Sequence, residues 1–600
     1  MVIENIHRHL EAGESKRVAA LKGAEEIGFT VVSISVSLVA AFIPLLFMGG
    51  IIGKLFLEFS LTATAAILIS VVVCLTLAPT LVSLFMDKAP THDPNKPGFF
   101  DRLVKRYDKV LTWALDHQRI MLAVFFLTVA GSVASFMAIP KGFFPLQDTG
   151  FVIGITQAAS DIPYEDMIAK HKQLEQILKN DPDITGFNHA VGGNNSTGSG
   201  RVWVVLSDPD DRDASASEII DRLRPQFAQI PGLQVFLRAA QDINLGAGPG
   251  RAQYSYVLKA LSSDELATWT QALTAKLRQN PIFTDLSNDL QWDANIIKLE
   301  LDRQEAARLG FAAADLDQAL YDAFGQRQIN EYQTETNQYN VILELDPAQR
   351  GTAESLNYFH LRSPTTGEMV PLLAFAKVLP ATNGPVVIAH NGMQPAANLS
   401  FNLAAGVALG DAVKALDQAR EELQMPASVS GSFQGAAQAF QDSLATQPLL
   451  IFTALLAVYI ILGVLYESFV HPLTILSTLP SAAIGAILLL WAWQLDFSIM
   501  ALIGIILLIG IVKKNGILMV DFALQAQREQ GMSAKDAIHQ ACLVRFRPIM
   551  MTTLAAILGA VPLMMGFGTG AELRVPLGVA VVGGLAFSQV LTLLLSLIHI

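Results

Sequence analysis

Residues 499–512 form a long apolar run with no charged side chain, and the run ends on two adjacent lysines, Lys513 and Lys514. Apolar sequence resumes after Asn515 and continues to Asp521. A charged side chain in a bilayer helix costs roughly 2.5–3.5 kcal/mol on insertion scales, so it normally faces a bundle interior and has a partner. Either the lysines lie at a membrane edge, or they need a carboxylate partner. We favour the second interpretation for Lys514, with a partner outside this chain, which predicts a proton- or ion-coupled membrane transporter.

The apolar residues are concentrated in two blocks, 27–140 and 443–600, around a more polar stretch at 141–442. Only 16% of the residues are charged, against roughly 25% in soluble domains. The net charge of −12 says little about partners, because local loop charges orient a membrane protein. Neither of the two cysteines lies in the polar stretch, which excludes a disulfide framework there.

Eight segments are long and apolar enough to cross a bilayer, which needs about 20 residues. They are 27–52, 59–86, 120–140, 443–466, 472–495, 497–521, 548–571 and 575 to the C-terminus. Lysines and arginines gather in segments 1–26, 87–119 and 525–547, which fall on one side if the spans alternate. That side is therefore predicted to be cytoplasmic, and residues 141–442 are predicted to lie outside the cytoplasm.

Residues 99–118 place apolar side chains at helical spacing, with lysines and arginines on the opposite face. Together with the flanking spans, this pattern favours an interfacial helix on the cytoplasmic leaflet within the segment 87–119. The alternative is an amphipathic helix packed on protein.

Residues 141–442 alternate strand-like and helix-like segments, which predicts small α+β units of the split βαβ type. The predicted strands are 151–157, 201–206, 234–237, 253–258, 296–301, 339–345, 386–390 and 397–402. The predicted helices are 164–180, 214–229, 262–280, 302–309, 313–324 and 409–423.

A glycine-rich stretch from Gly192 to Gly200, which includes Gly193 and Gly198, lies within this polar part. No lysine follows its glycines, so it is not a phosphate-binding loop. It is either a solvent-exposed hairpin loop or a mobile loop that gates a pocket. Phe151 and Phe187 are candidates for the wall of such a pocket, although most phenylalanines here must belong to a core.

No catalytic motif is present in the sequence: a Ser-His-Asp triad cannot be placed, and no strand-to-helix Gly-x-Ser-x-Gly elbow occurs. The methionines and histidines of the polar part are scattered along the sequence, which argues against a soft-metal relay. We therefore expect no enzyme, no bound metal and no cofactor, and no nucleic acid as a partner.

Several long segments resemble the resistance-nodulation-division (RND) superfamily of efflux pumps. Segments 503–523, 545–563 and 571–584 are similar to the tenth to twelfth spans of these pumps, and 465–480 to their eighth-to-ninth connection. Residues 139–150 resemble the entry to their second periplasmic half. Residues 319–344 are closest to the MdtB/MdtC type of multidrug subunit.

The resemblance implies an inner-membrane antiporter of small amphipathic drugs and protons, driven by the proton motive force without a cofactor. It further implies a homo- or heterotrimer in the lipid bilayer that docks to a periplasmic adaptor and an outer-membrane channel. Residues 141–245 would form one porter subdomain, 246–292 with 393–442 a second, and 293–392 a docking insertion. Two alternatives stay open: an RND-type exporter of metal cations or lipids, and a membrane scaffold that transports nothing.

The resemblance also assigns residues to a proton relay. Lys514 matches the relay lysine, Thr552 the relay threonine and Arg545 the relay arginine, and Asn515 would support the lysine. The alternatives are a Thr552 hydroxyl bonded to its own helix and an Arg545 that anchors the cytoplasmic side. Lys513 points roughly 100° away from Lys514 on a helix, so we expect it to snorkel or to pack against a loop.

In the resembling pumps, the two aspartates that partner the lysine lie just upstream of a segment like 1–11. We therefore expect an incomplete chain, with 1–26 as the cytoplasmic end of a truncated fourth span and its loop. The segment 443–600 would hold five spans, the last of them cut short. Residues 1–600 alone are then expected to lack proton-coupled transport.

Overall fold

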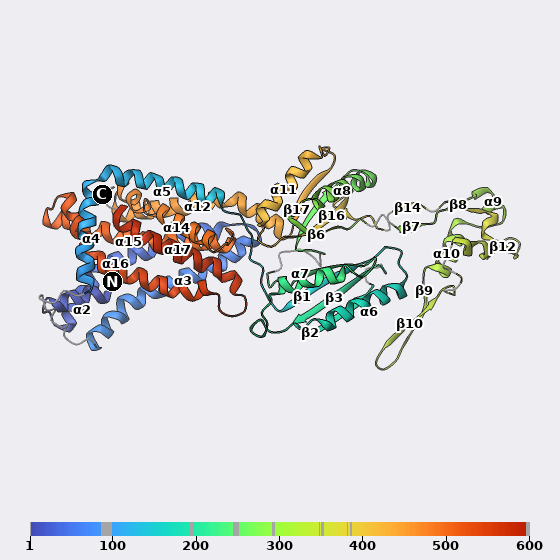
Figure 1. Cartoon of the computed structure of the whole chain (residues 1–600), viewed down its shortest axis with the longest axis horizontal. Helices are drawn as coiled ribbons and strands as arrows, with labels where there is room; N and C mark the ends of the chain where they lie inside the picture. Colours follow the sequence, from blue (N-terminus) through green and yellow to red (C-terminus); the bar gives the residue numbers. More distant parts are fainter. Residues whose placement is uncertain are drawn as a thin grey trace.

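The fold comes from a computed structural model, which describes residues 2–85, 99–192, 197–243, 251–290, 294–346, 349, 353–380, 382–384 and 387–595. Long helices gather at one end of the elongated molecule, and both termini lie at this end (Figure 1). Two α/β units follow along the long axis, and a third, smaller unit lies at the far end (Figure 1).

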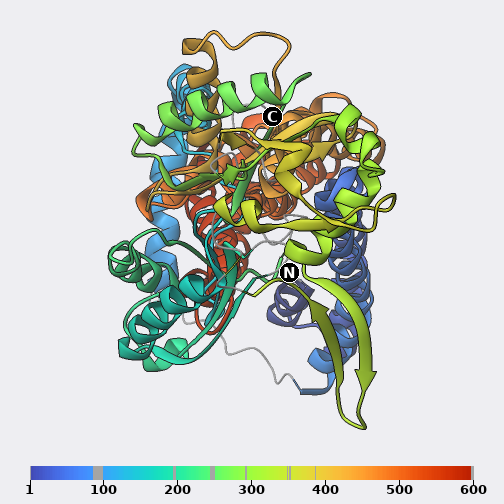
Figure 2. The same cartoon turned by 90° about the vertical axis from the view of Figure 1, so that its right-hand side faces the viewer.

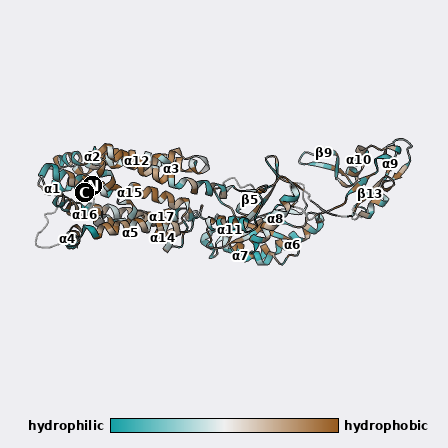
Figure 3. Cartoon of the chain, turned by 90° about the horizontal axis from the view of Figure 1, so that it is seen from above, coloured by the Kyte–Doolittle hydropathy of each residue, from teal (hydrophilic) through white to brown (hydrophobic). Residues whose placement is uncertain are grey.

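In the described residues, 8 helical segments are long and apolar enough to cross a membrane, the number that the sequence predicts. They are α2 (Lys16–Phe42) continued by η1 (Ile43–Phe47), α3 (Gly50–Phe85), α5 (Gln118–Ala138), α12 (Ala436–Tyr466), α13 (Val470–Leu476) with α14 (Leu479–Ala492), α15 (Ile499–Gln530), α16 (Ala534–Met565) and α17 (Ala571–Leu595). Most of them extend beyond the predicted apolar limits, because polar turns continue the helix outside its apolar part. Apolar residues dominate this end of the molecule (Figure 3).

Helix α15 lies at the centre of the bundle and packs against α2, α14, α16 and α17. In the most apolar stretch of α15, 83% of the residues are buried, against 11% in the corresponding stretch of α3. Protein therefore shields α15, whereas α3 is open to its surroundings. Glycines permit the close packing: a Cβ on Gly510 would lie 2.0 Å from Leu38 of α2. Small residues at such contacts let helices of a membrane bundle approach closely.

Helix α4 (Phe99–Asp116) packs one face on the bundle. Tyr107 stacks on Phe546 of α16 at a centroid distance of 4.6 Å and donates a hydrogen bond of 2.9 Å to the Leu593 carbonyl. Trp113 on the other side is 48% exposed. Protein thus covers the apolar face of α4, as expected for an amphipathic helix packed on protein. The position of α4 at the cytoplasmic leaflet stays a prediction.

The first α/β unit has the order β1 (Phe151–Gln157), α6 (Tyr164–Asn180), β2 (Ile184–Val191), β3 (Ser199–Leu206), α7 (Ala216–Phe227) and β4 (Gln234–Ala239). Its antiparallel sheet has the strand order β2-β3-β1-β4. Side chains of β3 alternate between buried and exposed, so Val202 and Val204 face the core that both helices cover.

The second unit is assembled from two separate stretches of sequence. It contains β5 (Tyr254–Lys259), α8 (Ser263–Arg278), β6 (Phe283–Asn288), β15 (His390–Asn391), β16 (Gln394–Leu403), α11 (Leu409–Glu422) and β17 (Ser430–Gln434). The sheet order is β15-β16-β5-β17, with β6 paired to β16. Viewed along the long axis, the two units lie beside each other (Figure 2).

The third unit interrupts the second. It contains β7 (Ala294–Ile296), β8 (Leu299–Leu301), α9 (Arg303–Arg308), α10 (Ala313–Phe324), β9 (Arg327–Gln333), β10 (Gln338–Leu343), β11 (His360–Arg362), β12 (Met369–Pro371), β13 (Ala376–Val378) and β14 (Thr382–Gly384). Strand β7 leaves the second unit, and β14 returns antiparallel to it. A strand at 386–390 is wrong for residues 387–389, which are irregular; residue 386 lies outside the described residues.

Candidate functional site

The two lysines of α15 have different surroundings. Lys513 is fully buried, and its ammonium group donates a hydrogen bond to the backbone carbonyl of Ser37 on α2. The expectation that Lys513 snorkels or packs against a loop is therefore wrong: the helix turns this side chain towards its neighbour α2. Backbone carbonyls are recognised partners for charges inside membranes.

Lys514 is only half-buried. Among the residues that the structure describes, it has no hydrogen bond or ion pair, and no carboxylate pairs with Lys513 either. The helix therefore carries two adjacent cations without a counter-charge in the described residues, in the most buried of the candidate spans. The relay role of Lys514 stays a prediction.

Asn515 is buried and points to α16. Its side-chain amide nitrogen lies 3.4 Å from the hydroxyl oxygen of Thr553, and its carbonyl oxygen has no partner in the described structure. Thr552, the predicted relay threonine, instead donates a 3.2 Å hydrogen bond to the Ile549 carbonyl of its own helix. The threonine beside Asn515 is thus the neighbour of the predicted one, because the two hydroxyls point about 100° apart around α16.

Arg545 lies two turns before Thr552 on α16. Its guanidinium carbon is 5.1 Å from the ring centroid of Phe522 on α15, and its Nε is buried with no hydrogen-bond partner in the described structure. Burial raises the pKa of Glu4 on α1 (Val2–Glu11), while the positive charges of Arg545 and Arg547 act against that rise. Arg545 therefore lies close enough to Glu4 for their charges to interact.

Asp521 is the residue that sequence reasoning missed, since it was treated only as the end of an apolar run. Its carboxylate accepts a 2.6 Å hydrogen bond from the hydroxyl of Tyr466 at the end of α12. Seven residues separate Lys514 from Asp521, so both lie on one face of α15, about 10 Å apart along its axis. That spacing was the signal in the sequence.

The glycine-rich stretch and its phenylalanines lie in the first α/β unit. Phe151 begins β1 and Phe187 lies in β2, both partly buried. Gly192 follows β2, while Gly193 lies outside the described residues. A Cβ on Gly198 would lie 2.5 Å from the Ala159 carbonyl oxygen, so close packing explains this glycine.

Gly200 belongs to β3 rather than to a loop. A Cβ there would lie 2.5 Å from the Thr156 hydroxyl oxygen and 2.7 Å from Nε2 of His171. The absent side chain makes room for these two polar groups. A gating role for the stretch stays a prediction.

A cavity of about 390 Å³ lies where both α/β units meet the helical end. Phe143, Arg224, Tyr254 and Asp496 are among the residues that line it. Burial, with a smaller contribution from Asp411, raises the pKa of Asp496 to about 6. The wall therefore combines aromatic surface with a few charged groups, as ligand pockets commonly do.

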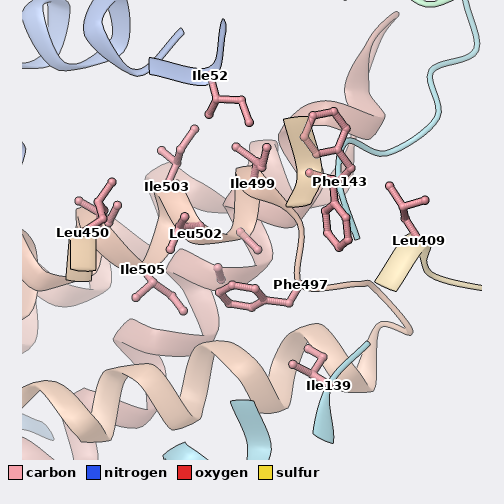
Figure 4. Close-up of a cluster of buried hydrophobic side chains, with 14 of the residues drawn as sticks. Ile52, Ile139, Phe143, Leu409, Leu450, Phe497, Ile499, Leu502, Ile503 and Ile505 are labelled. Carbon is pink, nitrogen blue, oxygen red and sulfur yellow. The ribbon is translucent and has the colours of Figure 1, made fainter. Parts of the chain in front are cut away.

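The residues beside this cavity also join the two ends of the molecule. Phe143 and Phe497 pack with Ile139 and Ile499 (Figure 4). Two backbone hydrogen bonds link the same two segments. The Phe497 amide donates to the Pro140 carbonyl at 2.9 Å, and the Ile499 amide donates to the Phe143 carbonyl at 3.0 Å. A displacement of α15 would therefore be transmitted to the entry of the first α/β unit.

A second, more apolar cavity of about 970 Å³ lies between η1 and the first half of α12. Ile43, Phe47, Leu449 and Leu450 supply its apolar wall, and Asp442 also lines it. Phe47 is 84% exposed, so this wall opens outward.

The model of the AcrB/AcrD/AcrF family matches residues 1–596 of this chain. The match covers both apolar parts and the polar part between them, including α15, α16 and both cavities.

Proposed function

The chain belongs to the AcrB/AcrD/AcrF family of RND permeases, and from this membership we propose that it is a subunit of a proton-driven exporter of small amphipathic drugs. Members of the family are membrane transporters and not enzymes. The observation that carries the proposal is the pair of adjacent lysines in the most buried candidate span, with no carboxylate partner in the described residues.

The proposed proton coupling rests on the attraction between a lysine and a carboxylate partner. A unit charge pair at 4 Å is worth about 4 kcal/mol at an effective dielectric constant near 20, before desolvation is counted. Protonation of a carboxylate partner of Lys514 would remove this attraction and let α15 shift against its neighbours. Asn515 would hold the lysine in place, and Thr552 and Arg545 would complete the relay.

The shift would reach the polar part through the contact between residues 139–143 and 496–499. Both cavities support an amphipathic cargo, because each combines apolar or aromatic walls with few charged groups. No cofactor is needed, since the proton motive force supplies the energy.

We further propose the assembly that goes with this activity. The chain lies in a bacterial inner membrane, with residues 141–442 in the periplasm. It is a subunit of a trimer of MdtB/MdtC type, which contains either three identical subunits or a mixture. The third unit then faces a periplasmic adaptor and an outer-membrane channel. Its β9–β10 hairpin supports this, because every residue of both strands except Arg327 is exposed.

The test is drug efflux by cells that express the natural gene with Lys514→Ala. Efflux should fall to the background of the empty vector while the protein remains at its normal level in the membrane. Arg547→Ala is the matched control, because it removes an exposed cation from the neighbouring span, and it should leave efflux unchanged. Full efflux by Lys514→Ala would refute proton coupling through this lysine, whereas no efflux above the empty vector by the wild type would favour a scaffold.

A further inference from the structure

Two histidines of the first α/β unit lie in direct contact, although 18 residues separate them in the sequence. Nδ1 of His171 on α6 is 3.2 Å from Nδ1 of His189 on β2, and their ring centroids are 5.2 Å apart. His171 is 1% exposed, whereas the side chain of His189 is 23% exposed. The contact is therefore buried on one side and open to solvent on the other.

The second nitrogen of each ring faces an oxygen. Nε2 of His171 lies 2.8 Å from the Thr156 hydroxyl, and Nε2 of His189 lies 3.8 Å from a carboxylate oxygen of Glu175. A histidine that ligates a metal almost always donates its other N–H to a carboxylate, a backbone carbonyl or water, and Glu175 places a carboxylate near His189. With both Nε2 atoms protonated, the lone pairs of the two Nδ1 atoms face each other, and a cation between them would remove this repulsion.

The spacing of the two Nδ1 atoms suits a shared metal ion. At Zn–N distances of about 2.0–2.1 Å, a separation of 3.2 Å subtends roughly 100° at the metal, close to the tetrahedral angle. We propose that His171 and His189 together bind one divalent transition-metal ion of the zinc or copper class through their Nδ1 atoms. Solvent completes the coordination on the exposed side of His189.

Two further features suit ligation. Burial, and secondarily the nearby His189, lowers the pKa of His171 to about 4, so this imidazole is neutral at physiological pH, as a metal ligand must be. Gly200 leaves the space that Thr156 and His171 occupy. Among the described residues no group of three or more His, Cys, Asp or Glu could hold a metal ion, so two protein ligands alone predict micromolar rather than tighter binding.

A chain of hydrogen bonds is the competing explanation. The Thr156 hydroxyl would donate to Nε2 of His171, Nδ1–H of His171 would donate to Nδ1 of His189, and Nε2–H of His189 would face Glu175. This arrangement satisfies all the groups without a metal. It predicts no zinc binding at the pair, which separates it from the proposal.

The experiment is a titration of Zn²⁺ into the purified full chain in detergent, carrying a tag without histidine, by isothermal calorimetry. We expect one ion per chain at the pair, with a micromolar dissociation constant that rises at least tenfold in His189→Gln. His390→Gln, which changes an exposed histidine of the second unit, should bind as the wild type does.

Two outcomes would overturn the metal site: no zinc binding by the wild type, or equal binding by wild type and His189→Gln. His9→Gln tests whether zinc binds at a different site, because His9 lies near Glu14 and Glu26. Loss of all zinc binding in His9→Gln would place the ion at the N-terminal helix and refute the pair. Electron paramagnetic resonance of bound Cu²⁺ gives an independent readout, with two coordinated imidazole nitrogens expected in the wild type and one in His189→Gln. The binding measurement does not depend on transport.

Discussion

Arg224 of α7 and Asp285 of β6 form a two-pronged ion pair that joins the two α/β units. Nε of the arginine donates to one carboxylate oxygen at 2.8 Å, and an Nη nitrogen donates to the other at 2.7 Å. Asn402 donates to the same carboxylate at 3.0 Å, and Asp285 adopts a positive φ of 51°. Arg224 also lines the 390 Å³ cavity, so the pair holds the two units together beside this cavity.

Separating this pair should loosen the contact between the units. Because Arg224 is 37% exposed, we expect a coupling energy of only about 1 kcal/mol between Arg224→Ala and Asp285→Ala in a double-mutant cycle. Denaturant unfolding of the four proteins measures it. A cycle of Arg222→Ala with Asp285→Ala is the control, since Arg222 pairs with Asp181 and Asp183 within its own unit; additive effects in both cycles would contradict the linkage.

The buried Lys513 should contribute to transport and not to stability. Burying a charge that has no counter-charge is costly, and an apolar side chain of similar volume does not carry this cost. We therefore expect Lys513→Met to keep the free energy of unfolding or to raise it by about 1 kcal/mol, and to reduce efflux. Thermal unfolding in detergent measures the first effect.

Lys535→Met serves as the reference for that measurement. Lys535 is exposed and paired with Asp116 at 2.8 Å, so its loss should change stability by less than about 0.5 kcal/mol. A loss above about 2 kcal/mol in Lys513→Met would show that the hydrogen bond to Ser37 stabilises the bundle instead.

Gly200 should not tolerate a side chain. Gly200→Ala would force its Cβ against Thr156, His171 and the Ala190 carbonyl, and overpacking of this kind costs about 1–3 kcal/mol. Gly186→Ala is the matched control on β2, because a Cβ there meets no atom within 4 Å. Unfolding of the two variants side by side tests the difference, and equal stability would refute the packing role of Gly200.

Asp496 should make stability depend on pH. Its folded pKa of about 6 lies above the ordinary value of 3.8, so the folded state favours the protonated carboxyl. The stabilisation is complete below about pH 4 and is lost as the pH rises through 6, by an order of 1–3 kcal/mol.

Asp496→Asn should therefore raise the unfolding midpoint at pH 7.5 and change it little at pH 4. Asp411→Asn provides the comparison, because Asp411 adds to the rise at Asp496 and is itself more exposed. A midpoint difference between wild type and Asp496→Asn that is the same at both pH values would contradict the assignment.

Local patterns in the sequence predict the number of apolar spans, the α-helices of the polar part and several of its strands. Residues 151–157, 164–180 and 313–324 were predicted with the bounds that the structure shows. These segments carry strong local patterns, either alternation along a strand or helical spacing of apolar side chains. Strands β2, β6, β9 and β17 are among those missed, since their residues alternate weakly and pairing with a neighbour makes them strands.

Which side chains meet depends on the tertiary packing. The sequence places Lys513 and Lys514 next to each other, but the packing of α2 on α15 determines that Lys513 is the one enclosed. The same holds for Asn515 with Thr553, for Arg224 with Asp285 and for His171 with His189, whose partners lie on other elements. Local periodicity sets the face of a helix or strand on which a residue lies, whereas contacts between distant segments depend on how those faces pack.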